Sequence, residues 1–214
     1  MARRLRIPDA GVTRLSLYLR ELSRLERQGT AFVSSAELAR ALNLTGAAVR
    51  RDFSYFGQFG TSGRGYEIRR LKQIIPSILG LSGRIWSVAM VGAGNLGSAL
   101  LAYRGFRERG FVMKAVFDKD ARKIGRLIEG RRVESAGKMA ELVRRRRIHI
   151  GIIAVPAADA QEVCRQLVRG GIKAILNFAP VSLTVPPSVK LRNVDLSVEL
   201  ESLAYYLSSS HANA

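Results

Sequence analysis

Cysteine, histidine and long apolar runs are scarce in this sequence, and each scarcity excludes a class of protein. The single cysteine, Cys164, rules out an internal disulfide and gives no sign of an oxidising compartment. The two histidines, His149 and His211, form no metal-ligand cluster with other residues, so we expect no metal. Apolar runs such as IHIGIIAV are too short to span a bilayer, and no apolar run follows the basic start MARRLRIPDAG. We therefore expect a soluble, cytoplasmic protein that does not bind membranes.

Acidic residues are also few: 17 Asp and Glu stand against 35 Lys and Arg, which gives a formal net charge of +18. Residues 1–84 alone contain 15 basic and 6 acidic side chains, a net charge of +9. Such an excess favours a polyanionic partner, of which nucleic acid is the common one. Arginine enrichment from genome composition is the alternative, so the charge alone does not identify a partner.

A turn-rich break, GLSG at 80–83, separates two halves with different patterns. Helical periodicities and one glycine-rich hairpin precede it. After it, the short β-branched runs SVAMVG, MKAVFD, RRVE, IHIGIIAV and KAILNF alternate with helical segments. This alternation predicts an α/β domain with a doubly wound parallel sheet. We expect domains over 1–82 and 83–194, followed by a helix and tail over 195–214.

The first half has the pattern of a helix-turn-helix. The stretch Ser34–Glu37 is a capping box, with a serine N-cap and a glutamate three positions later. The core faces of the two short helices are predicted from helical spacing to be Leu38, Ala41 and Leu42, and then Val49, Phe53 and Phe56. A longer helix, about Asp9 to Gln28, adds the core face Leu15, Tyr18, Leu22 and Leu25.

The second short helix is typical of a DNA recognition helix. Thr45 can cap it, and Gly46 and Ala47 give it a small N-terminus that fits a major groove about 12 Å wide. Arg50 and Arg51 lie on its outward face, where they can pair with guanine edges or phosphates. A capped hairpin with a solvated basic face is the alternative. The candidate DNA-contacting residues are Thr45, Gly46, Ala47, Arg50, Arg51, Ser54, Tyr55 and, in the segment that follows, Arg64.

That following segment, GQFGTSGRGY at 57–66, has four glycines, Arg64 near its tip and then the strand-like YEIRR. A glycine-rich hairpin can lie close to a DNA backbone and place an arginine in the minor groove. The hairpin together with the helices before it predicts a winged-helix DNA-binding domain.

The stretch VGAGNLGSAL at 91–100 has the G-x-G-x-x-G spacing of a dinucleotide-binding loop. It follows an apolar run and opens a helix predicted to run through Leu96, Ala99, Leu100 and Tyr103, which is the context that the motif requires. Gly92 permits the tight turn, Gly94 lets the backbone approach a pyrophosphate, and Gly97 lets the helix pack on the sheet. We therefore predict a Rossmann domain whose loop residues Ala93, Asn95 and Leu96 also contact the ligand.

Asp118 ends the second strand of this domain, 26 residues after Gly92. A carboxylate there accepts hydrogen bonds from the adenosine ribose and repels a 2′-phosphate, which favours NAD(H) over NADP(H). Lys119 follows directly and can soften that preference. An acidic turn residue without a ligand is the alternative.

Two later strand ends are candidate walls for the nicotinamide half of the ligand. Val155 and Pro156 end one strand, and Asn177 and Phe178 end the next. Ligands of open α/β sheets bind beyond the carboxyl ends of the strands, but an ordinary strand exit remains equally open here.

The residues that a hydride-transfer enzyme needs are not evident. His149 lies inside a strand pattern and is expected to be packed, His211 lies in the tail, and Cys164 has no histidine partner nearby in sequence. No tyrosine is followed four positions later by lysine. The run Arg144–Arg147 is expected to stabilise a helix C-terminus rather than to bind DNA.

In order along the chain, VRRDFSYFGQFGTSGRGY, VGAGNLGSAL, AYRGF, VFDKD, ILNFAPV and NVDL resemble the Rex family of redox-sensing transcriptional repressors, roughly from Ile7 to Tyr206. The resemblance implies a winged helix, a Rossmann domain that binds NADH or NAD⁺, and a C-terminal helix exchanged within a homodimer. It also implies that NADH closes the dimer and releases a palindromic operator, with Tyr103 and Asp195 linking the nicotinamide site to the partner subunit. Some relatives have arginine at Asn95 and an aromatic residue at Leu196.

The C-terminal segment VDLSVELESLAYYLSSS shows a stripe of its own. Helical spacing places on one side Leu196, Leu200, Leu203 and Leu207, with Tyr205 and Tyr206 beside them. The residues alone leave open whether this stripe meets a second subunit or packs back on its own domain.

We therefore predict a non-enzymatic repressor that senses the NADH/NAD⁺ ratio. The competing hypothesis is an NAD-dependent dehydrogenase with a basic N-terminal accessory domain. A third, a nucleotide-binding regulator that acts on proteins, leaves the basic recognition helix and the hairpin unexplained.

Overall fold

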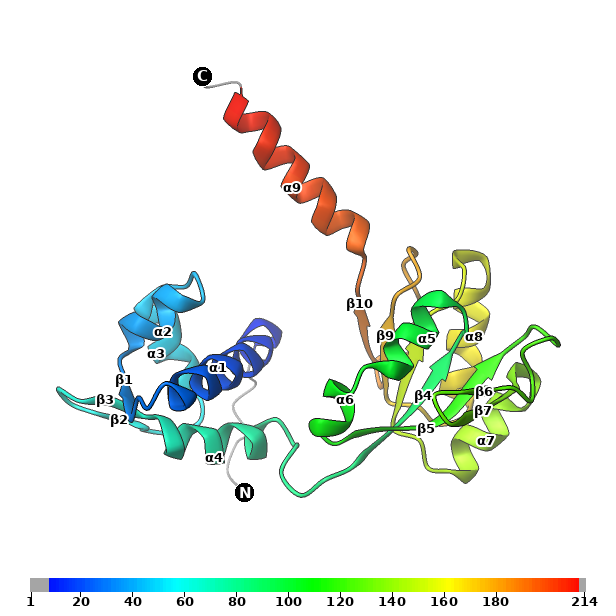
Figure 1. Cartoon of the computed structure of the whole chain (residues 1–214), viewed down its shortest axis with the longest axis horizontal. Coiled ribbons are helices and arrows are strands. Elements are labelled where there is room, and N and C mark those ends of the chain that lie inside the picture. The colour runs from blue at the N-terminus through cyan, green and yellow to red at the C-terminus, as the bar shows by residue number, and fades with distance from the viewer. Residues whose placement is uncertain (1–7, 212–214) are drawn as a thin grey trace. The chain divides into compact units, whose positions relative to one another are not determined.

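The computed structural model describes residues 8–211, with side chains described through residue 208, and the chain divides into two compact units, 1–84 and 85–214. The division lies two residues beyond the break predicted at 82/83. Residues 1–7 of the predicted first domain and 212–214 of the predicted tail lie outside the described residues. Figure 1 shows the elements of both units along the chain.

The first unit is a small helical domain with a three-stranded sheet. Its elements in chain order are α1 (Asp9–Arg27), β1 (Phe32–Val33), α2 (Ser35–Ala41), α3 (Gly46–Ser54), β2 (Gly60–Thr61), β3 (Gly65–Glu67) and α4 (Ile68–Ile78). Strand β3 pairs with both neighbours in antiparallel fashion, in the order β1-β3-β2. Helices α2 and α3 followed by the β2–β3 hairpin make the predicted winged helix.

The core of this unit lies beneath α1, α3 and α4. Its buried members include the predicted Leu15, Tyr18, Leu22, Leu38, Val49 and Phe53, and Leu25, Leu42 and Phe56 pack at its edge. The prediction for Ala41 is wrong: Ala41 is exposed, and Ala39, next to the buried Leu38, is buried instead.

The strand predicted for YEIRR is also wrong beyond its first two residues. Ile68 begins α4, in which Ile68, Leu71 and Ile75 are buried at helical spacing. The helical period of these apolar residues continues past the short strand and outweighs the β-branched character of the first turn.

The second unit contains a seven-stranded sheet in the order β10-β9-β8-β4-β5-β7-β6, parallel except for the β6–β7 pair. Its strands are β4 (Trp86–Val91), β5 (Phe111–Asp118), β6 (Leu127–Ile128), β7 (Arg131–Ser135), β8 (Ile150–Ile153), β9 (Ala174–Asn177) and β10 (Lys190–Asn193). The six parallel strands have the order of a classic Rossmann sheet, so the predicted α/β fold is confirmed. Strands β6 and β10 were not predicted, since neither has an apolar run.

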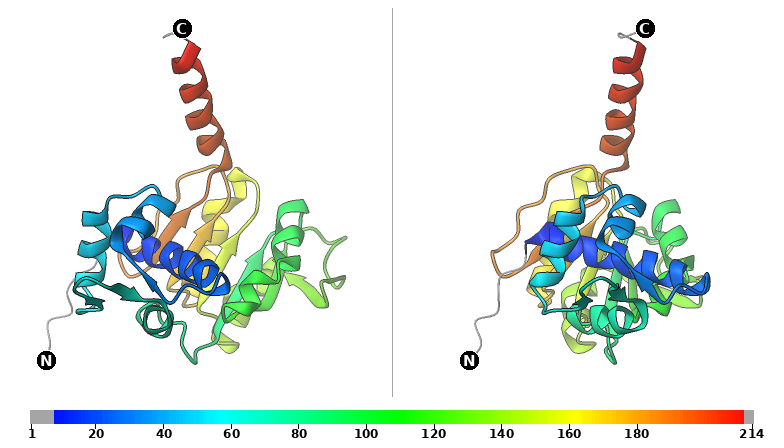
Figure 2. Two further views of the ribbon diagram at one scale, coloured as in Figure 1. Left: turned by 60° about the vertical axis from the view of Figure 1, so that its left-hand side comes forward. Right: turned by 90° about the vertical axis from the view of Figure 1, so that its left-hand side faces the viewer.

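Helices cover both faces of this sheet (Figure 2). They are α5 (Asn95–Ala102), α6 (Gly105–Glu108), the 3₁₀ turn η1 (Ala136–Lys138), α7 (Met139–Arg145) and α8 (Ala157–Arg169). Helices α7 and α8 bury one face of the sheet, whereas α5 and α6 pack against the other. Helix α5 ends one residue before Tyr103, which lies beyond it rather than within it.

Helix α9 (Leu196–His211) follows β10 and leaves the sheet as a separate helix (Figure 1). Its large apolar side chains are all more than half exposed: Leu196, Val198, Leu200, Leu203, Tyr205, Tyr206 and Leu207. Packing back on its own domain, the simpler of the two alternatives, is therefore not what the chain does.

Candidate DNA-binding surface and dinucleotide pocket

Helix α3 has a basic outer face, and its opposite face is buried in the first unit. The Thr45 hydroxyl accepts a hydrogen bond from the backbone N–H of Ala48 at 3.1 Å, so the predicted N-cap is confirmed. Arg50, Arg51 and Ser54 are exposed, as predicted, while the opposite face is buried. Of the other candidates, Ala47 is exposed and Gly46 and Tyr55 are half-buried.

The inner face of α3 carries a buried carboxylate that the sequence did not reveal. Asp52 is 1 % exposed and accepts two hydrogen bonds from Arg14 of α1, at 2.6 and 2.7 Å, and one from the Tyr18 hydroxyl at 2.7 Å. Burial raises the pKa of Asp52, but the hydrogen bonds from Arg14 and Tyr18 outweigh it and hold the pKa below its usual value. The charged network therefore fixes α3 on α1.

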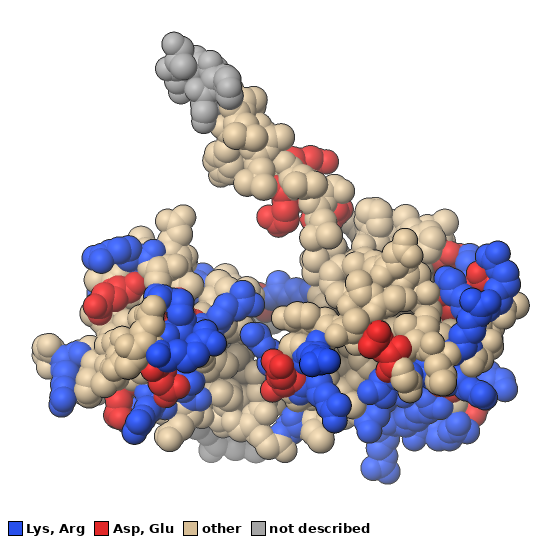
Figure 3. Space-filling view, in the orientation of Figure 1, with Lys and Arg blue, Asp and Glu red and all other residues tan. Residues whose placement is uncertain are grey.

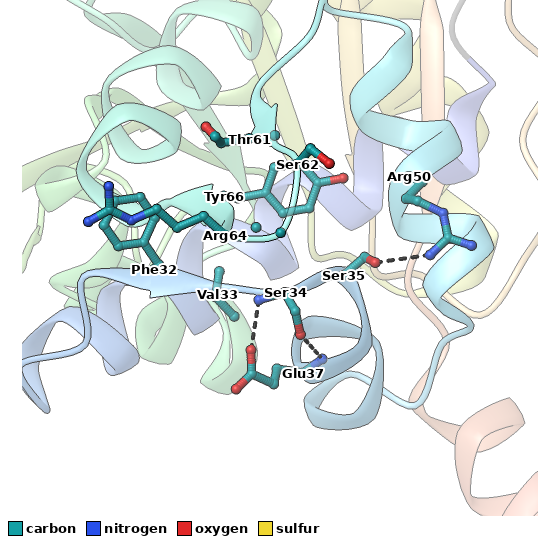
Figure 4. A pocket seen from close by; sticks show the side chains of 13 residues that line it. Phe32, Val33, Ser34, Ser35, Glu37, Arg50, Thr61, Ser62, Arg64 and Tyr66 are labelled. Atoms are coloured by element: carbon teal, nitrogen blue, oxygen red, sulfur yellow. Dashed lines mark hydrogen bonds between the residues drawn. The ribbon is translucent and has the colours of Figure 1, made fainter.

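A second contact orients the outer face of α3. The Arg50 guanidinium donates a hydrogen bond to the Ser35 hydroxyl at 3.0 Å, at the N-terminus of α2. Beside it the predicted capping box is complete, because Glu37 N donates to Ser34 Oγ and Ser34 N donates to Glu37 Oε2. These bonds bring Arg50 to the rim of a recess between α2, α3 and the hairpin (Figure 4).

The hairpin β2–β3 closes the other side of that recess. Gly65 has a φ of +83°, and a Cβ there would lie 2.6 Å from the carbonyl oxygen of Val33, so only glycine lets β3 approach β1 this closely. Arg64 is exposed, and its guanidinium carbon lies 4.1 Å from the ring centre of Phe32 (Figure 4). A cation–π contact therefore holds the arginine of the wing over β1.

The glycine loop between β4 and α5 combines two crowded glycines with one open glycine. A Cβ on Gly92, whose φ is +100°, would lie 2.2 Å from the Ala154 carbonyl oxygen, and one on Gly97 would lie 1.8 Å from that of Gly92. A Cβ on Gly94 would meet no atom within 4 Å. Gly92 and Gly97 thus serve close packing, whereas the backbone at Gly94 faces open space, as a dinucleotide-binding loop requires.

Asp118 lies at the end of β5, next to this loop, and is buried. Its Oδ2 accepts a hydrogen bond from Ala93 N at 2.8 Å, and its Oδ1 accepts one from Asp120 N at 2.8 Å. Burial raises the pKa of Asp118, but these two amides and the Lys123 ammonium outweigh it, so the pKa lies below its usual value. Asp118 is therefore an ionised carboxylate that also braces the glycine loop.

A pocket of about 320 Å³ opens between these elements, at the carboxyl ends of the strands. Six of the residues predicted for the ligand line it: Gly92, Gly94, Asp118, Lys119, Val155 and Pro156. The sequence did not point to the remaining walls: Val91, Asp120, Lys123, Ala136, Ala154, Asp159 and Val163. Helix α8 supplies Asp159 and Val163, which lie far along the chain from the glycine loop and carry no motif.

The other predicted ligand contacts lie outside this pocket. Ala93, Asn95, Leu96 and Gly97 follow its rim into α5, where Asn95 and Leu96 are exposed. Asn177 is fully buried, and its amide bonds to Ala179, Val181 and Asn193 close the loop after β9. Phe178 packs in the core beside it. Asn177 therefore shapes the strand exit, and its role toward a ligand stays a prediction.

The two residues expected to link the ligand to a partner subunit are both near the surface. Tyr103 is 57 % exposed and stacks edge-on against Phe106, with ring centres 5.1 Å apart. Asp195 precedes α9 and accepts a hydrogen bond from Ser197 N at 3.0 Å. Their role toward a ligand stays a prediction.

Structural contacts within the second unit involve His149, Cys164 and the arginine run. His149 is packed against Trp86, and its Nδ1 accepts a hydrogen bond from Ser87 N at 3.0 Å. Cys164 is buried in the core, where burial raises the pKa of its thiol. In the arginine run, Arg146 binds Glu134 and Arg144 binds the carbonyl of Arg169.

Within the described part of the chain, no group of three or more potential metal-ligating side chains gathers. Over the same residues, no helix is long and apolar enough to cross a membrane. Basic side chains outnumber acidic ones on the face shown in Figure 3, whereas α9 carries only acidic charges there.

Two family models match the chain. The first, a putative DNA-binding protein N-terminus, covers residues 6–54, and the second, a CoA binding domain, covers residues 84–181.

The curated relatives match along nearly the whole chain. A redox-sensing transcriptional repressor Rex from Carboxydothermus hydrogenoformans is 52 % identical over 200 residues, which is 94 % of this chain and 96 % of that protein. A protein of the same name from Desulfitobacterium hafniense is 47 % identical, covering 97 % of this chain and 99 % of that protein.

Solved structures also match along nearly the whole chain. A crystal structure of RSP in complex with beta-NAD+ and operator DNA superposes with a TM-score of 0.90 at 36 % identity, over 97 % of this chain and 95 % of that chain. RSP in complex with beta-NADH superposes with a TM-score of 0.88 at 35 % identity, over 97 % of both chains.

Proposed function

The chain belongs to the Rex family of redox-sensing transcriptional repressors, and we propose that it binds operator DNA through α3 and the wing and releases it when NADH binds at the glycine loop. The observation that carries this proposal is the glycine loop itself, where the backbone at Gly94 is open beside the ionised Asp118. It is a repressor and not an enzyme, as are the relatives that it matches by name. Because a repressor must reach the chromosome, the proposed site of action is the cytoplasm.

The dinucleotide is held, in this proposal, by the residues that line the pocket. The amides at the N-terminus of α5 face the pyrophosphate, and Asp118 accepts hydrogen bonds from the adenosine ribose. Val155 and Pro156 form the wall toward the nicotinamide. To release DNA, the dinucleotide must bind the released state more tightly than the DNA-binding state. A difference in binding free energy of about 5.5 kcal/mol shifts the ratio of released to DNA-binding protein from 1:99 to 99:1.

In this proposal, the DNA contacts are made in the major groove, in the minor groove and along the DNA backbone. Arg50 and Arg51 reach base edges and phosphates in the major groove, and Arg64 reaches the minor groove. The small N-terminus of α3, formed by Thr45, Gly46 and Ala47, lies closest to the groove, while Ser54 and Tyr55 contact the backbone.

The proposed repressor is a homodimer joined by α9, since a palindromic operator needs two recognition helices. The exposed apolar stripe of α9 needs a cover, and the helix has two glutamates and no lysine or arginine, which suits a partner subunit as basic as this chain. In this proposal, Tyr103 and Asp195 act toward the partner subunit when the ligand binds, and the exposure of Tyr103 supports this role.

A DNA-release titration tests the proposed function. Fluorescence anisotropy of labelled palindromic DNA is followed while NADH, NAD⁺, NADPH and coenzyme A are added separately. We expect NADH to release the DNA at the lowest concentration and coenzyme A to have no effect. DNA binding that is indifferent to NADH contradicts the sensor, and an absence of specific DNA binding contradicts the repressor.

Replacing Arg64 by alanine is expected to weaken operator binding and to reduce the slope of log affinity against log salt by about 0.9, the effect of one lost phosphate or groove contact. Phe32→Leu removes only the ring beneath Arg64, so we expect a loss of about two- to fivefold, the size of a cation–π contact of ~0.5–1 kcal/mol. Affinities are measured between 50 and 200 mM salt. Arg165→Ala, on α8, is the control, and an equal loss in that variant would show a general charge effect.

Replacing Leu203 by glutamate is expected to dissociate the proposed dimer. Each of the two copies would lose the free energy of burying one leucine side chain at the interface, about 1.5–3 kcal/mol. Sedimentation equilibrium measures the dissociation constant of the dimer, and Leu127→Glu, at a leucine of β6 that is even more exposed than Leu203, is the control. A dimer that survives Leu203→Glu unchanged contradicts the α9 interface.

A further inference from the structure

Three ion pairs surround the end of the pocket where Asp118 lies. They join Lys123 to Asp118 at 3.1 Å, Arg122 to Asp120 at 2.8 Å, and Lys119 to Asp159 at 2.7 Å. Each of these three cations is therefore matched by one carboxylate.

The pair between Lys119 and Asp159 differs from the other two. Those two join residues within five positions of each other, whereas Lys119 and Asp159 are 40 positions apart. The Lys119 ammonium donates to both carboxylate oxygens of Asp159, at 2.8 and 2.7 Å, across from the loop after β5 to the first turn of α8. The positive end of the α8 dipole favours an acidic residue at that place.

The pair between Lys119 and Asp159 matters for the ligand because of where Lys119 lies. Lys119 follows Asp118 directly and lines the same pocket. A Rossmann site that accepts a 2′-phosphate does so with a cation near the ribose-binding carboxylate position. A free Lys119 would be such a cation, and Asp159 occupies it.

We propose that Asp159 is a specificity-determining residue, which holds the Lys119 ammonium on α8 and so prevents it from recruiting the 2′-phosphate of NADPH. Asp118 repels that phosphate, and Asp159 holds back Lys119, the neighbouring cation that would otherwise offset the repulsion. This inference rests on the proposed function, because it concerns the dinucleotide pocket of the sensor. It accounts for how a lysine beside Asp118 is compatible with a sensor for NADH.

The test measures direct binding of NADH and NADPH to the full-length protein by calorimetry. In Asp159→Asn, we expect the affinity for NADPH relative to NADH to rise about fivefold, the effect of one exposed charge pair of up to ~1 kcal/mol. In the double variant Asp159→Asn with Lys119→Met, the rise should vanish, since no cation is released. Glu162→Gln removes a carboxylate that pairs with Arg165 on the same helix, outside the pocket lining, and serves as the matched control.

Each outcome separates the inference from the proposed function. If wild-type protein binds NADH but Asp159→Asn leaves the ratio unchanged, the inference is overturned and the sensor stands. A rise that persists without Lys119, or that Glu162→Gln reproduces, also overturns it, because the effect would then be one of general charge. If wild-type protein does not bind NADH, the proposed function fails and the inference with it.

Discussion

Replacing Gly94 by threonine is expected to weaken NADH binding by about 10- to 100-fold, the cost of ~1–3 kcal/mol for forcing extra atoms into a close contact, while the protein stays folded. The side chain would enter the open space that a pyrophosphate needs, and its hydroxyl would cap the free amides of α5 that face the phosphate. Threonine ranks close to glycine as an N-cap, so the helix itself should hardly change. Calorimetry measures binding, and the fluorescence of the single tryptophan, Trp86 at the start of β4, monitors folding of the unit.

Gly97→Ala is the contrasting variant, because it changes a glycine of the same loop that serves packing. A Cβ at Gly97 would lie 1.8 Å from the carbonyl oxygen of Gly92, so α5 must move away from the loop. We expect this variant to lose stability as well as binding, with a midpoint shift in the Trp86 transition. If Gly94→Thr binds NADH as tightly as wild type, the pyrophosphate does not lie at this loop.

Replacing Asp52 by alanine is expected to destabilise the DNA-binding unit by about 3–5 kcal/mol, the usual result of leaving one member of a buried ion pair without its partner. Arg14 would lose its carboxylate, and the Tyr18 hydroxyl would lose its acceptor in the core. Hydrogen exchange of the amides in α1 and α3 measures the effect in the whole protein. The Trp86 transition, which reports the other unit, should not move, and a shift there would point to a global defect instead.

The same network predicts a pH dependence. Since the pKa of Asp52 is lowered by folding, its contribution to stability is present above the unfolded value of about 3.9 and is lost as the pH falls through the folded pKa. The stability difference between wild type and Asp52→Asn should therefore shrink below about pH 4. A difference that stays constant from pH 7 to pH 3 would show that Asp52 is not ionised in the folded protein.

Much of the candidate site could be predicted from the sequence, because it depends on residues that are close together along the chain. Capping by Thr45 and Ser34 depends on residues within three positions, and the structure contains both bonds. Gly92, Gly94 and Gly97 have a fixed spacing, and Asp118 ends an apolar strand. Where two local signals competed, as at Ile68, the sequence misled, since a β-branched residue also suits the buried face of a helix.

The residues that were missed act over long separations along the chain. Asp52 pairs with Arg14 and Tyr18 of another helix, and Asp159 meets Lys119 from the far side of the pocket. A charged residue that will be buried looks in sequence like any charged residue on a solvated helix face. The bond from the Asn177 amide to Asn193 could not be foreseen for a related reason, since Asn193 lies on a strand that has no apolar pattern.

The winged helix and the Rossmann sheet could be predicted from the chain alone, because they follow from periodicity, caps and glycine spacing, and the resemblance to the family followed from motifs in a fixed order. Which carboxylates are buried, which cations they hold and which glycine stays open became known only from the packing of the elements. The tertiary structure also decided that α9 leaves its own domain, since an apolar stripe specifies that it will be covered but not by which surface. Pairings of that kind depend on how the elements pack, which local sequence patterns do not encode.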